Sequence, residues 1–161
     1  VASFYLSWAK KERSLLARLV AIAAACLVLP LAINVDIPHP WFAADAIAPK
    51  GWYLCALLTT YFATTVPFVK TVIRERNSTP WFVGSITVHV IVVLAMAALA
   101  VQGYNYWTHV LVWVLLTGRA VAMPLLAKRR GVPWRPRNIG MPEIGYSLLV
   151  FATLPYGLAF P

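Results

Sequence analysis

The chain has 161 residues, of which 61% are hydrophobic and 12% are charged, and its formal net charge is +9. Globular proteins are about 45–50% apolar, and so few charged residues cannot cover a soluble core, which excludes an ordinary soluble domain and favours a membrane protein. Cations are enriched in the cytoplasmic loops of membrane proteins. The positive charge therefore indicates topology, and we expect no nucleic-acid partner.

Five apolar runs come close to the roughly 20 residues that a helix needs to cross a bilayer. In chain order they cover residues 14–33, 51–69, 81–101, 106–127 and 141–160. The longest gap, residues 34–50, holds three prolines and predicts an ordered loop without room for a soluble domain. The predicted fold is therefore all-α, a polytopic bundle of five transmembrane helices in one domain. Pro67, Pro124 and Pro155 fall inside these runs, where each removes one helical hydrogen bond.

The cations alternate between the two ends of the predicted helices, and three groups hold 12 of the 14 lysines and arginines. These groups are Lys10, Lys11, Arg13 and Arg18 around the start of the first run, Lys70, Arg74 and Arg76 after the second, and Lys128, Arg129, Arg130, Arg135 and Arg137 after the fourth. Because such groups mark the cytoplasmic side of a membrane, the pattern predicts a cytoplasmic amino end and an external carboxyl end.

The cysteines and acidic residues indicate little reactive chemistry. Cys26 and Cys55 lack the spacing of metal ligands, and we expect both to be packing residues without a disulfide. The five acidic residues are not spaced as a carboxylate metal site. The sequence therefore predicts no catalytic residue, no metal site and no cofactor.

Arg119 lies inside the fourth apolar run, about 10 Å from its inner end at roughly 1.5 Å per residue. Helical side chains lean toward the amino end of their helix, so Arg119 points away from the cytoplasm and cannot easily reach the inner surface. An unpaired arginine at this depth costs about 2.5–3.5 kcal/mol. We therefore expect a partner, which could be Glu143, the Ala120 carbonyl freed by Pro124, a lipid phosphate or an anionic ligand.

Other polar side chains fall in the same half of the bilayer as Arg119. The candidate ligand-binding or lipid-binding residues are Arg119, His89, Glu143, Arg74 and Thr65. The structural alternative is that Arg119 and Glu143 form an ion pair that locks two helices, that His89 bonds to a neighbouring helix, and that the threonine bonds to backbone. A shared depth is the feature that joins these residues into one hypothesis.

Two basic segments, residues 70–77 and 128–138, follow the second and fourth runs. Each cation near a membrane surface gains about 1 kcal/mol from anionic lipid headgroups, so topology alone can explain both segments. The sharper hypothesis is that both segments border the polar layer and grip a phosphate-bearing headgroup, which the planar arginine fork suits. Anionic membrane lipids are therefore the predicted ligands.

The segments "YFATTVPFVKTVIRERN", "LLTGRAVAMPLLAKRRG" and "RPRNIGMPEIGYSLLV", with the first run, resemble the YwiC-like family of bacterial integral membrane proteins. The resemblance covers most of the chain and implies a bacterial plasma membrane. It also implies that Arg74, Glu75, Arg119, Pro124, Gly140 and Glu143 are family features. Family members carry an earlier membrane region with a His-Gly-Ala-Trp stretch, so the chain resembles the later part of such a protein.

A more distant resemblance is to UbiA-type prenyltransferases, which are all-helical membrane enzymes with a cavity open to lipid. The segments "WAKKERSLLARL" and "PFVKTVIRERN" occupy comparable places. Those enzymes hold diphosphate through magnesium bound by two aspartate-rich motifs. Here the corresponding loop offers Arg74, Glu75, Arg76 and Asn77, so the resemblance does not extend to that chemistry.

Three functional hypotheses follow. The first is a non-catalytic membrane protein that serves as an accessory or lipid-binding subunit of a bacterial inner-membrane assembly, with other membrane subunits as partners. The second is a UbiA-like enzyme that processes an isoprenoid lipid. The third is a transporter of a small anion, with His89 and Arg119 as a proton-coupled site.

Overall fold

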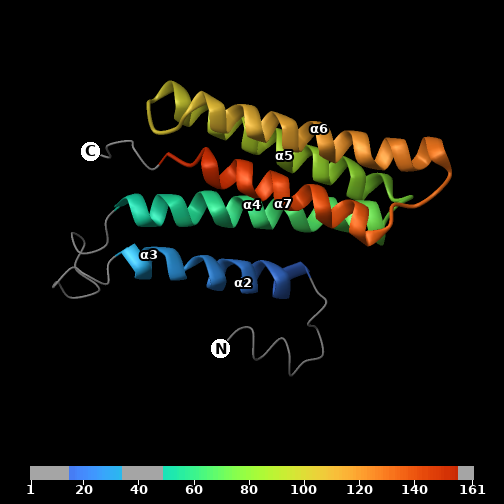
Figure 1. Ribbon diagram of the computed structural model, residues 1–161, viewed down its shortest axis with the longest axis horizontal. Coiled ribbons are helices and arrows are strands. Elements are labelled where there is room, and N and C mark those ends of the chain that lie inside the picture. Colours follow the sequence, from blue (N-terminus) through green and yellow to red (C-terminus); the bar gives the residue numbers. More distant parts are fainter. Residues whose placement is uncertain (1–14, 34–48, 156–161) are drawn as a thin grey trace. The chain divides into compact units, whose positions relative to one another are not determined.

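A computed structural model describes residues 15–33 and 49–155 of the protein (Figure 1). All regular secondary structure in these ranges is helical, in the order α2 (Leu15–Cys26), α3 (Val28–Ile33), α4 (Pro49–Ile73), α5 (Thr79–Val101), α6 (Trp107–Arg130) and α7 (Pro136–Ala152). The chain divides inside α4, between Val66 and Pro67, into two compact units. The second unit holds the last turns of α4 together with α5, α6 and α7.

Four segments of the described ranges are long and apolar enough to cross a membrane. They are Leu15–Ala32, which covers α2 and most of α3, Gly51–Ile73 in α4, Thr79–Val101 in α5 and Trp107–Arg130 in α6. The 17 residues of α7 span about 26 Å, slightly less than the roughly 30 Å hydrocarbon core. The predicted all-helical membrane bundle is confirmed, and each of the five predicted runs contains a helix.

The first predicted run is interrupted. A turn at Leu27 separates α2 from α3, although the sequence pattern predicted one helix over residues 14–33. Pro30 explains the break, because proline lacks an N–H and its ring crowds the carbonyl four residues earlier, which belongs to Cys26, the last residue of α2. Cys26 and Cys55 are both buried and free, as expected.

The last predicted helix is shifted toward the amino end. It was expected over residues 141–160, but α7 begins at Pro136 because proline is tolerated in the first helical turn, where its missing N–H would have no partner. The preceding Arg135 has the extended conformation usual before proline (φ −69°, ψ 142°). The helix ends at Ala152, so the expectation that Pro155 lies inside a helix was wrong. Residues 156–160 lie outside the described residues.

Both α4 and α6 continue into the basic segments that follow the apolar runs. Pro67 and Pro124 lie inside these helices, as predicted. α6 ends at Gly131, which has a left-handed conformation (φ 66°) and donates its N–H to the Lys128 carbonyl. Glycine adopts this conformation without the steric cost of a Cβ atom. The chain therefore turns sharply immediately after three consecutive cations.

The second unit buries several polar side chains among its apolar core residues and exposes aliphatic ones. The buried stripe of α5 includes Ser85 and His89, and that of α6 includes His109 and Arg119. The exposed large side chains of the two helices are mainly aliphatic, namely Val83, Val88, Val90, Ile91, Leu94, Val101, Leu111, Val114, Leu115, Leu125 and Leu126, together with Trp107. Water-soluble proteins show the opposite preference. This distribution identifies lipid as the solvent of these helices.

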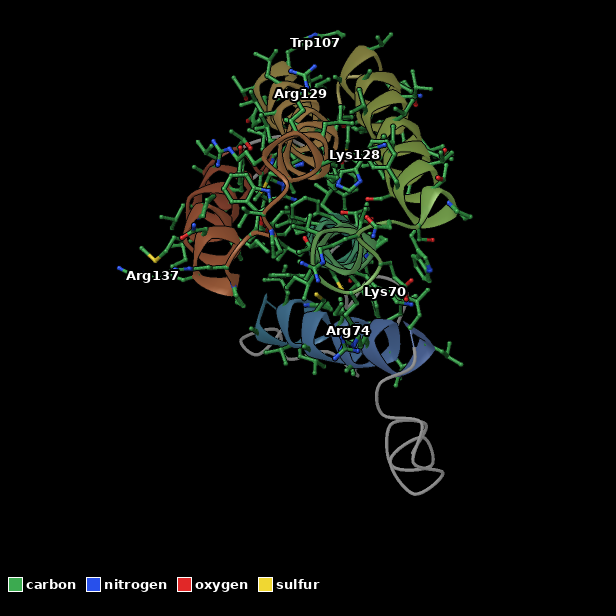
Figure 2. All side chains as sticks on the ribbon, turned by 90° about the vertical axis from the view of Figure 1, so that its right-hand side faces the viewer. Lys70, Arg74, Trp107, Lys128, Arg129 and Arg137 are labelled. Atoms are coloured by element: carbon green, nitrogen blue, oxygen red, sulfur yellow. The ribbon has the colours of Figure 1, made fainter. Side chains whose placement is uncertain are left out.

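Apart from the buried Arg119, the cations of the second unit gather at one end, where α4 and α6 finish and α7 begins. Figure 2 looks onto this end, with Lys70, Arg74, Lys128, Arg129 and Arg137 labelled. We call it the basic end; it comprises residues 70–78 and 128–137. The two basic segments that are separate in sequence therefore lie at the same end of the unit.

Candidate functional site

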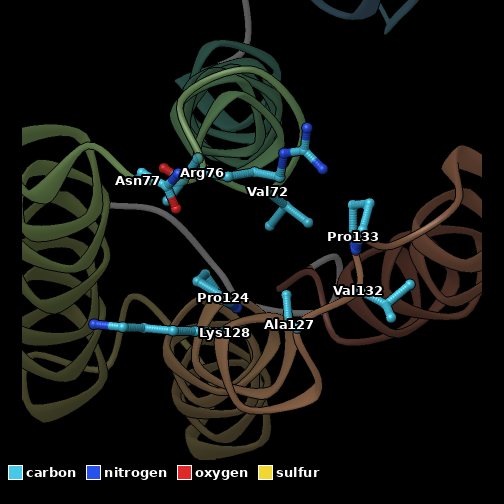
Figure 3. Close-up of a pocket in the computed structure, with 10 residues that line it drawn as sticks. Val72, Arg76, Asn77, Pro124, Ala127, Lys128, Val132 and Pro133 are labelled. Carbon is cyan, nitrogen blue, oxygen red and sulfur yellow. The ribbon is translucent and has the colours of Figure 1, made fainter.

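A cavity of about 290 Å³ opens between the two segments of the basic end (Figure 3). One wall comes from the end of α4 and the turn after it, with Thr71, Val72, Arg76 and Asn77. The other wall comes from the end of α6 and the loop after it, with Pro124, Ala127, Lys128, Gly131, Val132 and Pro133. Each basic segment thus contributes one cation to a shared space, and no acidic side chain is among these lining residues.

The loop between α6 and α7 is anchored to the bundle by Trp134. Its indole Nε1–H donates to the Met123 carbonyl at 2.8 Å. The ring also packs against a buried apolar cluster, which consists of Phe68, Val72, Ala120 and Ile139. This anchoring fixes the neighbouring Val132 and Pro133 as a wall of the cavity.

Two other cations of the basic end are held on aromatic rings. Lys70 Nζ lies 3.5 Å from the ring centroid of Trp81, and Arg130 Cζ lies 4.9 Å from that of Trp134. Such cation–π contacts contribute about 0.5–1 kcal/mol at exposed sites. Tryptophans at the edge of a membrane span are typical of the interface between hydrocarbon and water.

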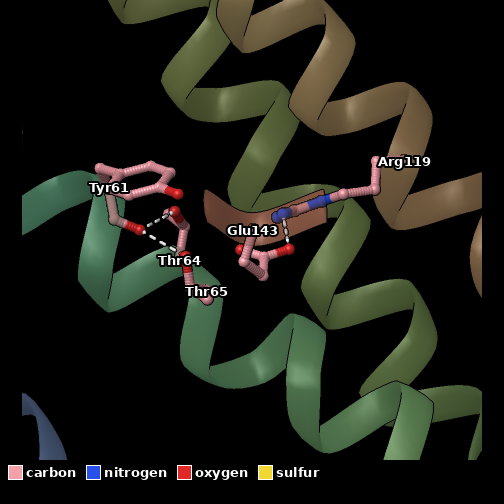
Figure 4. Close-up of polar contacts among 5 residues, drawn as sticks. All are labelled: Tyr61, Thr64, Thr65, Arg119 and Glu143. Carbon is pink, nitrogen blue, oxygen red and sulfur yellow. Dashed lines mark hydrogen bonds and ion pairs between the residues drawn. The ribbon is translucent and has the colours of Figure 1, made fainter. Parts of the chain in front are cut away.

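Arg119 forms an ion pair with Glu143, from Nη1 to Oε1, which joins α6 to α7 (Figure 4). The Arg119 side chain is 3% exposed and that of Glu143 is 18% exposed. Glu143 was one of the partners considered from the sequence, and it is the acidic side chain that neutralises Arg119. The two charges of the pair cancel, so Arg119 needs no further counter-charge.

Two aromatic rings complete the environment of Arg119. Its Cζ atom lies 4.0 Å from the ring centroid of Phe68 and 4.8 Å from that of Tyr146. A desolvated cation–π contact can contribute about 2 kcal/mol. The guanidinium is therefore stabilised by side chains from the end of α4 and from α7 as well as by its carboxylate partner.

A buried histidine also lies in α5. His89 Nδ1 donates to the Ser85 carbonyl at 2.7 Å. Three buried polar atoms have no hydrogen-bond partner within the described residues: Ser85 Oγ, Arg119 Nε and Glu143 Oε2. Buried polar atoms of this kind are commonly bonded to internal water. The hydrogen bond of His89 is to its own helix, and a depth shared by His89 and Arg119 stays a prediction.

Both ring nitrogens of a second buried histidine, His109, form hydrogen bonds. Trp113 Nε1 can only donate, and it bonds to His109 Nε2 at 3.1 Å, so this nitrogen carries no proton. The proton is thereby assigned to Nδ1, which donates to Thr153 Oγ1 at 2.9 Å, and that hydroxyl donates to the Leu149 carbonyl. His109 is therefore a neutral link between α6 and the end of α7.

The remaining two predicted site residues lie elsewhere. Thr65, in the first unit, donates its hydroxyl to the Tyr61 carbonyl at 3.0 Å, which is the backbone bond given as its structural alternative. Arg74 is exposed in the turn after α4 and does not line the cavity, whereas Arg76 does. Of the five candidates, the structure brings Arg119 and Glu143 into contact, and His89 is buried in α5.

Sequence reasoning missed several residues of both regions. Ser85 could have been found, because it lies four residues before His89 and therefore on the same helical face. Phe68 and Tyr146 carried no such signal, since aromatic residues in a membrane helix are common. Arg76 and Lys128 were recognised as parts of basic segments, but nothing in their spacing showed that they line one cavity.

The chain was also compared with protein-family models, curated proteins and solved structures, and none of them matches. The candidate site therefore rests on the residues and geometry of this chain.

Proposed function

We propose that the protein is a non-catalytic, multi-pass membrane protein that binds an anionic lipid headgroup in the cavity of the basic end. The observation that carries this proposal is that two basic segments, separated by two membrane helices in the sequence, supply Arg76 and Lys128 to one cavity. In keeping with its resemblance to the YwiC-like family, we place it in the bacterial plasma membrane with the basic end toward the cytoplasm.

The size and position of the cavity support a headgroup as the ligand. Its volume of about 290 Å³ is at the lower limit of ligand pockets, which are about 300–1,000 Å³. A headgroup with the first carbons of its lipid fits this volume, and complete acyl chains do not. The chains would instead lie along the exposed aliphatic faces of α5 and α6, which end at the same membrane surface.

The Arg119–Glu143 pair supports a non-catalytic role. An arginine that held a diphosphate or carried an anion would need its charge available to that ligand. Here Glu143 neutralises it and two aromatic rings enclose it. This arrangement favours a helix lock over the enzymatic and transport hypotheses.

We further propose that the protein is a subunit of a larger membrane assembly. The motivation is the absence of a recognisable catalytic constellation in the sequence. A lipid-binding subunit of this kind would deliver a lipid to the other subunits, or would keep the assembly bound to a particular lipid.

The test is purification of the protein in a mild detergent, followed by native mass spectrometry of the lipids and proteins that remain bound. Wild-type protein is expected to retain anionic lipid, and the Arg76→Gln/Lys128→Gln variant is expected to lose it. Arg129→Gln is the matched control, because Arg129 is exposed beside Lys128 but does not line the cavity. Equal retention by all three proteins would refute the lipid site.

The same experiment tests the subunit role separately. A membrane protein that copurifies in a fixed ratio with wild type would support it. A monomer without any protein partner, prepared directly from the native membrane, would remove the subunit role and leave the lipid site untouched.

A further inference from the structure

We infer that the cavity of the basic end selects a lipid whose headgroup is a terminal phosphate monoester over lipids whose phosphate is a diester. This inference rests on the proposed lipid site and names its ligand class. It follows from the charge of the lining, the donors that remain free, and the apolar surface beside them.

The charge of the lining calls for about two negative charges. Arg76 and Lys128 supply two cations, and no acidic residue lines the cavity. A phosphate monoester carries about −1.5 to −2 at pH 7 because its second pKa is near 6. The phosphate of a diester carries a single negative charge, so a diester would leave the equivalent of about one cation unpaired.

The hydrogen-bond donors also suit a terminal phosphate. The Thr71 hydroxyl donates its proton to the Pro67 carbonyl at 2.7 Å, which removes it as a donor to a ligand. The side-chain donors that remain in the lining are Arg76, Asn77 and Lys128. All three carry N–H groups, and Arg76 and Lys128 are also positively charged. A monoester offers three terminal oxygens to these donors, whereas a diester offers only two.

The rest of the lining disfavours a second polar substituent. Val72, Pro124, Ala127, Val132 and Pro133 present mostly carbon to the cavity. The alcohol of a diester headgroup, such as glycerol, would place hydroxyl groups against this surface and leave them without partners, which costs free energy. The single ester arm of a monoester leads directly into hydrocarbon and needs no such partners.

The volume agrees with the same ligand. About 290 Å³ corresponds to roughly ten water molecules at about 30 Å³ each. This accommodates a phosphate and a few carbon atoms. Two membrane lipids share the chemistry: a diacylglycerol phosphate, which is phosphatidic acid, and a polyprenyl monophosphate.

The experiment is a lipid titration of the full chain in detergent, read by native mass spectrometry. The probes are dioleoyl phosphatidic acid, dioleoyl phosphatidylglycerol and dioleoyl phosphatidylcholine, which share their acyl chains, together with a polyprenyl monophosphate. We expect phosphatidic acid to bind about tenfold more tightly than phosphatidylglycerol, a difference of about 1.4 kcal/mol. The relative affinity of the two monoesters then distinguishes the two lipid sources.

Two further measurements separate recognition of the monoester from general attraction. Lys128→Gln should reduce the affinity for phosphatidic acid to that for phosphatidylglycerol, while Arg129→Gln should retain the preference. Lowering the pH from 7.5 to 5 protonates the monoester, whose second pKa is near 6, and should remove the preference without affecting phosphatidylglycerol. Melting curves of each variant in detergent, with Lys128→Arg as a charge-conserving control, identify any variant that fails to fold.

The outcomes distinguish this inference from the proposed function. Equal binding of phosphatidic acid and phosphatidylglycerol, both above phosphatidylcholine, would overturn the monoester inference and leave an anionic-lipid site. Equal binding of all the lipids would overturn both.

Discussion

Replacing Glu143 with leucine would leave the charge of Arg119 inside the helix bundle without its carboxylate. The Arg119 side chain is 3% exposed, so water cannot take the place of the lost partner. Breaking a buried ion pair by removing one member costs about 3–5 kcal/mol. The rings of Phe68 and Tyr146 remain in contact with the guanidinium and offset part of this cost. We therefore expect Glu143→Leu to lower the free energy of unfolding by about 3 kcal/mol.

The double variant Arg119→Leu/Glu143→Leu is the informative comparison. Replacement of a whole buried ion pair by apolar side chains is often neutral or stabilising, so the double variant should be more stable than Glu143→Leu alone. Arg119→Leu should cost less than Glu143→Leu, because the Glu143 side chain is 18% exposed and the Arg119 side chain only 3%. These relations predict a coupling free energy of about 3 kcal/mol between the two positions.

The assay is unfolding of the detergent-solubilised protein by titration with sodium dodecyl sulfate, followed by circular dichroism. A double-mutant cycle isolates the pairwise free energy as long as the single variants make no new interactions. If Glu143→Leu costs less than about 1 kcal/mol, or the two single costs simply add in the double variant, the reasoning about a buried, neutralised pair is wrong.

Three further predictions concern other parts of the molecule. His109→Phe keeps an aromatic ring but removes the two side-chain hydrogen bonds that pass through His109, and should lower the free energy of unfolding by about 1–3 kcal/mol in the same assay. Arg76→Gln should weaken phosphatidic acid binding more than Arg74→Gln, because only the former removes a cation from the cavity lining; equal losses in native mass spectrometry would place the ligand elsewhere. In intact cells, a membrane-impermeant maleimide should label Gln102→Cys and spare Val132→Cys, since the cation pattern puts the basic end in the cytoplasm; the reverse labelling would invert the topology.

The class of fold and the Arg119–Glu143 pair could be predicted from sequence for the same reason. Hydrocarbon tolerates few polar groups, so each of them restricts the arrangements that a membrane chain can adopt. Arg119 lies deep in an apolar run, and Glu143 is the acidic residue nearest that depth in the following run. Few acidic residues are available, so Glu143 was one of the four partners that the sequence left open.

The helix ends and the cavity could not be predicted in the same way. Hydropathy places a helix in the bilayer, but the ends of α6 and α7 depend on Gly131 and Pro136, which lie outside the apolar runs. The cavity depends on the loop after α6, which the Trp134 hydrogen bond to the Met123 carbonyl holds in place. The spacing of hydrophobic residues does not predict this contact. For that reason the sequence did not show that Arg76, and not Arg74, lines the cavity.

The position of Glu143 in the chain has a consequence for biogenesis. It follows Arg119 by 24 residues, so α6 leaves the ribosome before the residue that neutralises its arginine. Inserted alone, α6 would carry the unpaired charge at a cost of about 2.5–3.5 kcal/mol. Insertion of α6 and α7 together, as a helical hairpin, brings the two charges into the membrane as a neutral pair. The short loop after Gly131 keeps the two helices adjacent, so we expect the ion pair that stabilises the finished bundle also to favour entry of its last two helices into the bilayer together.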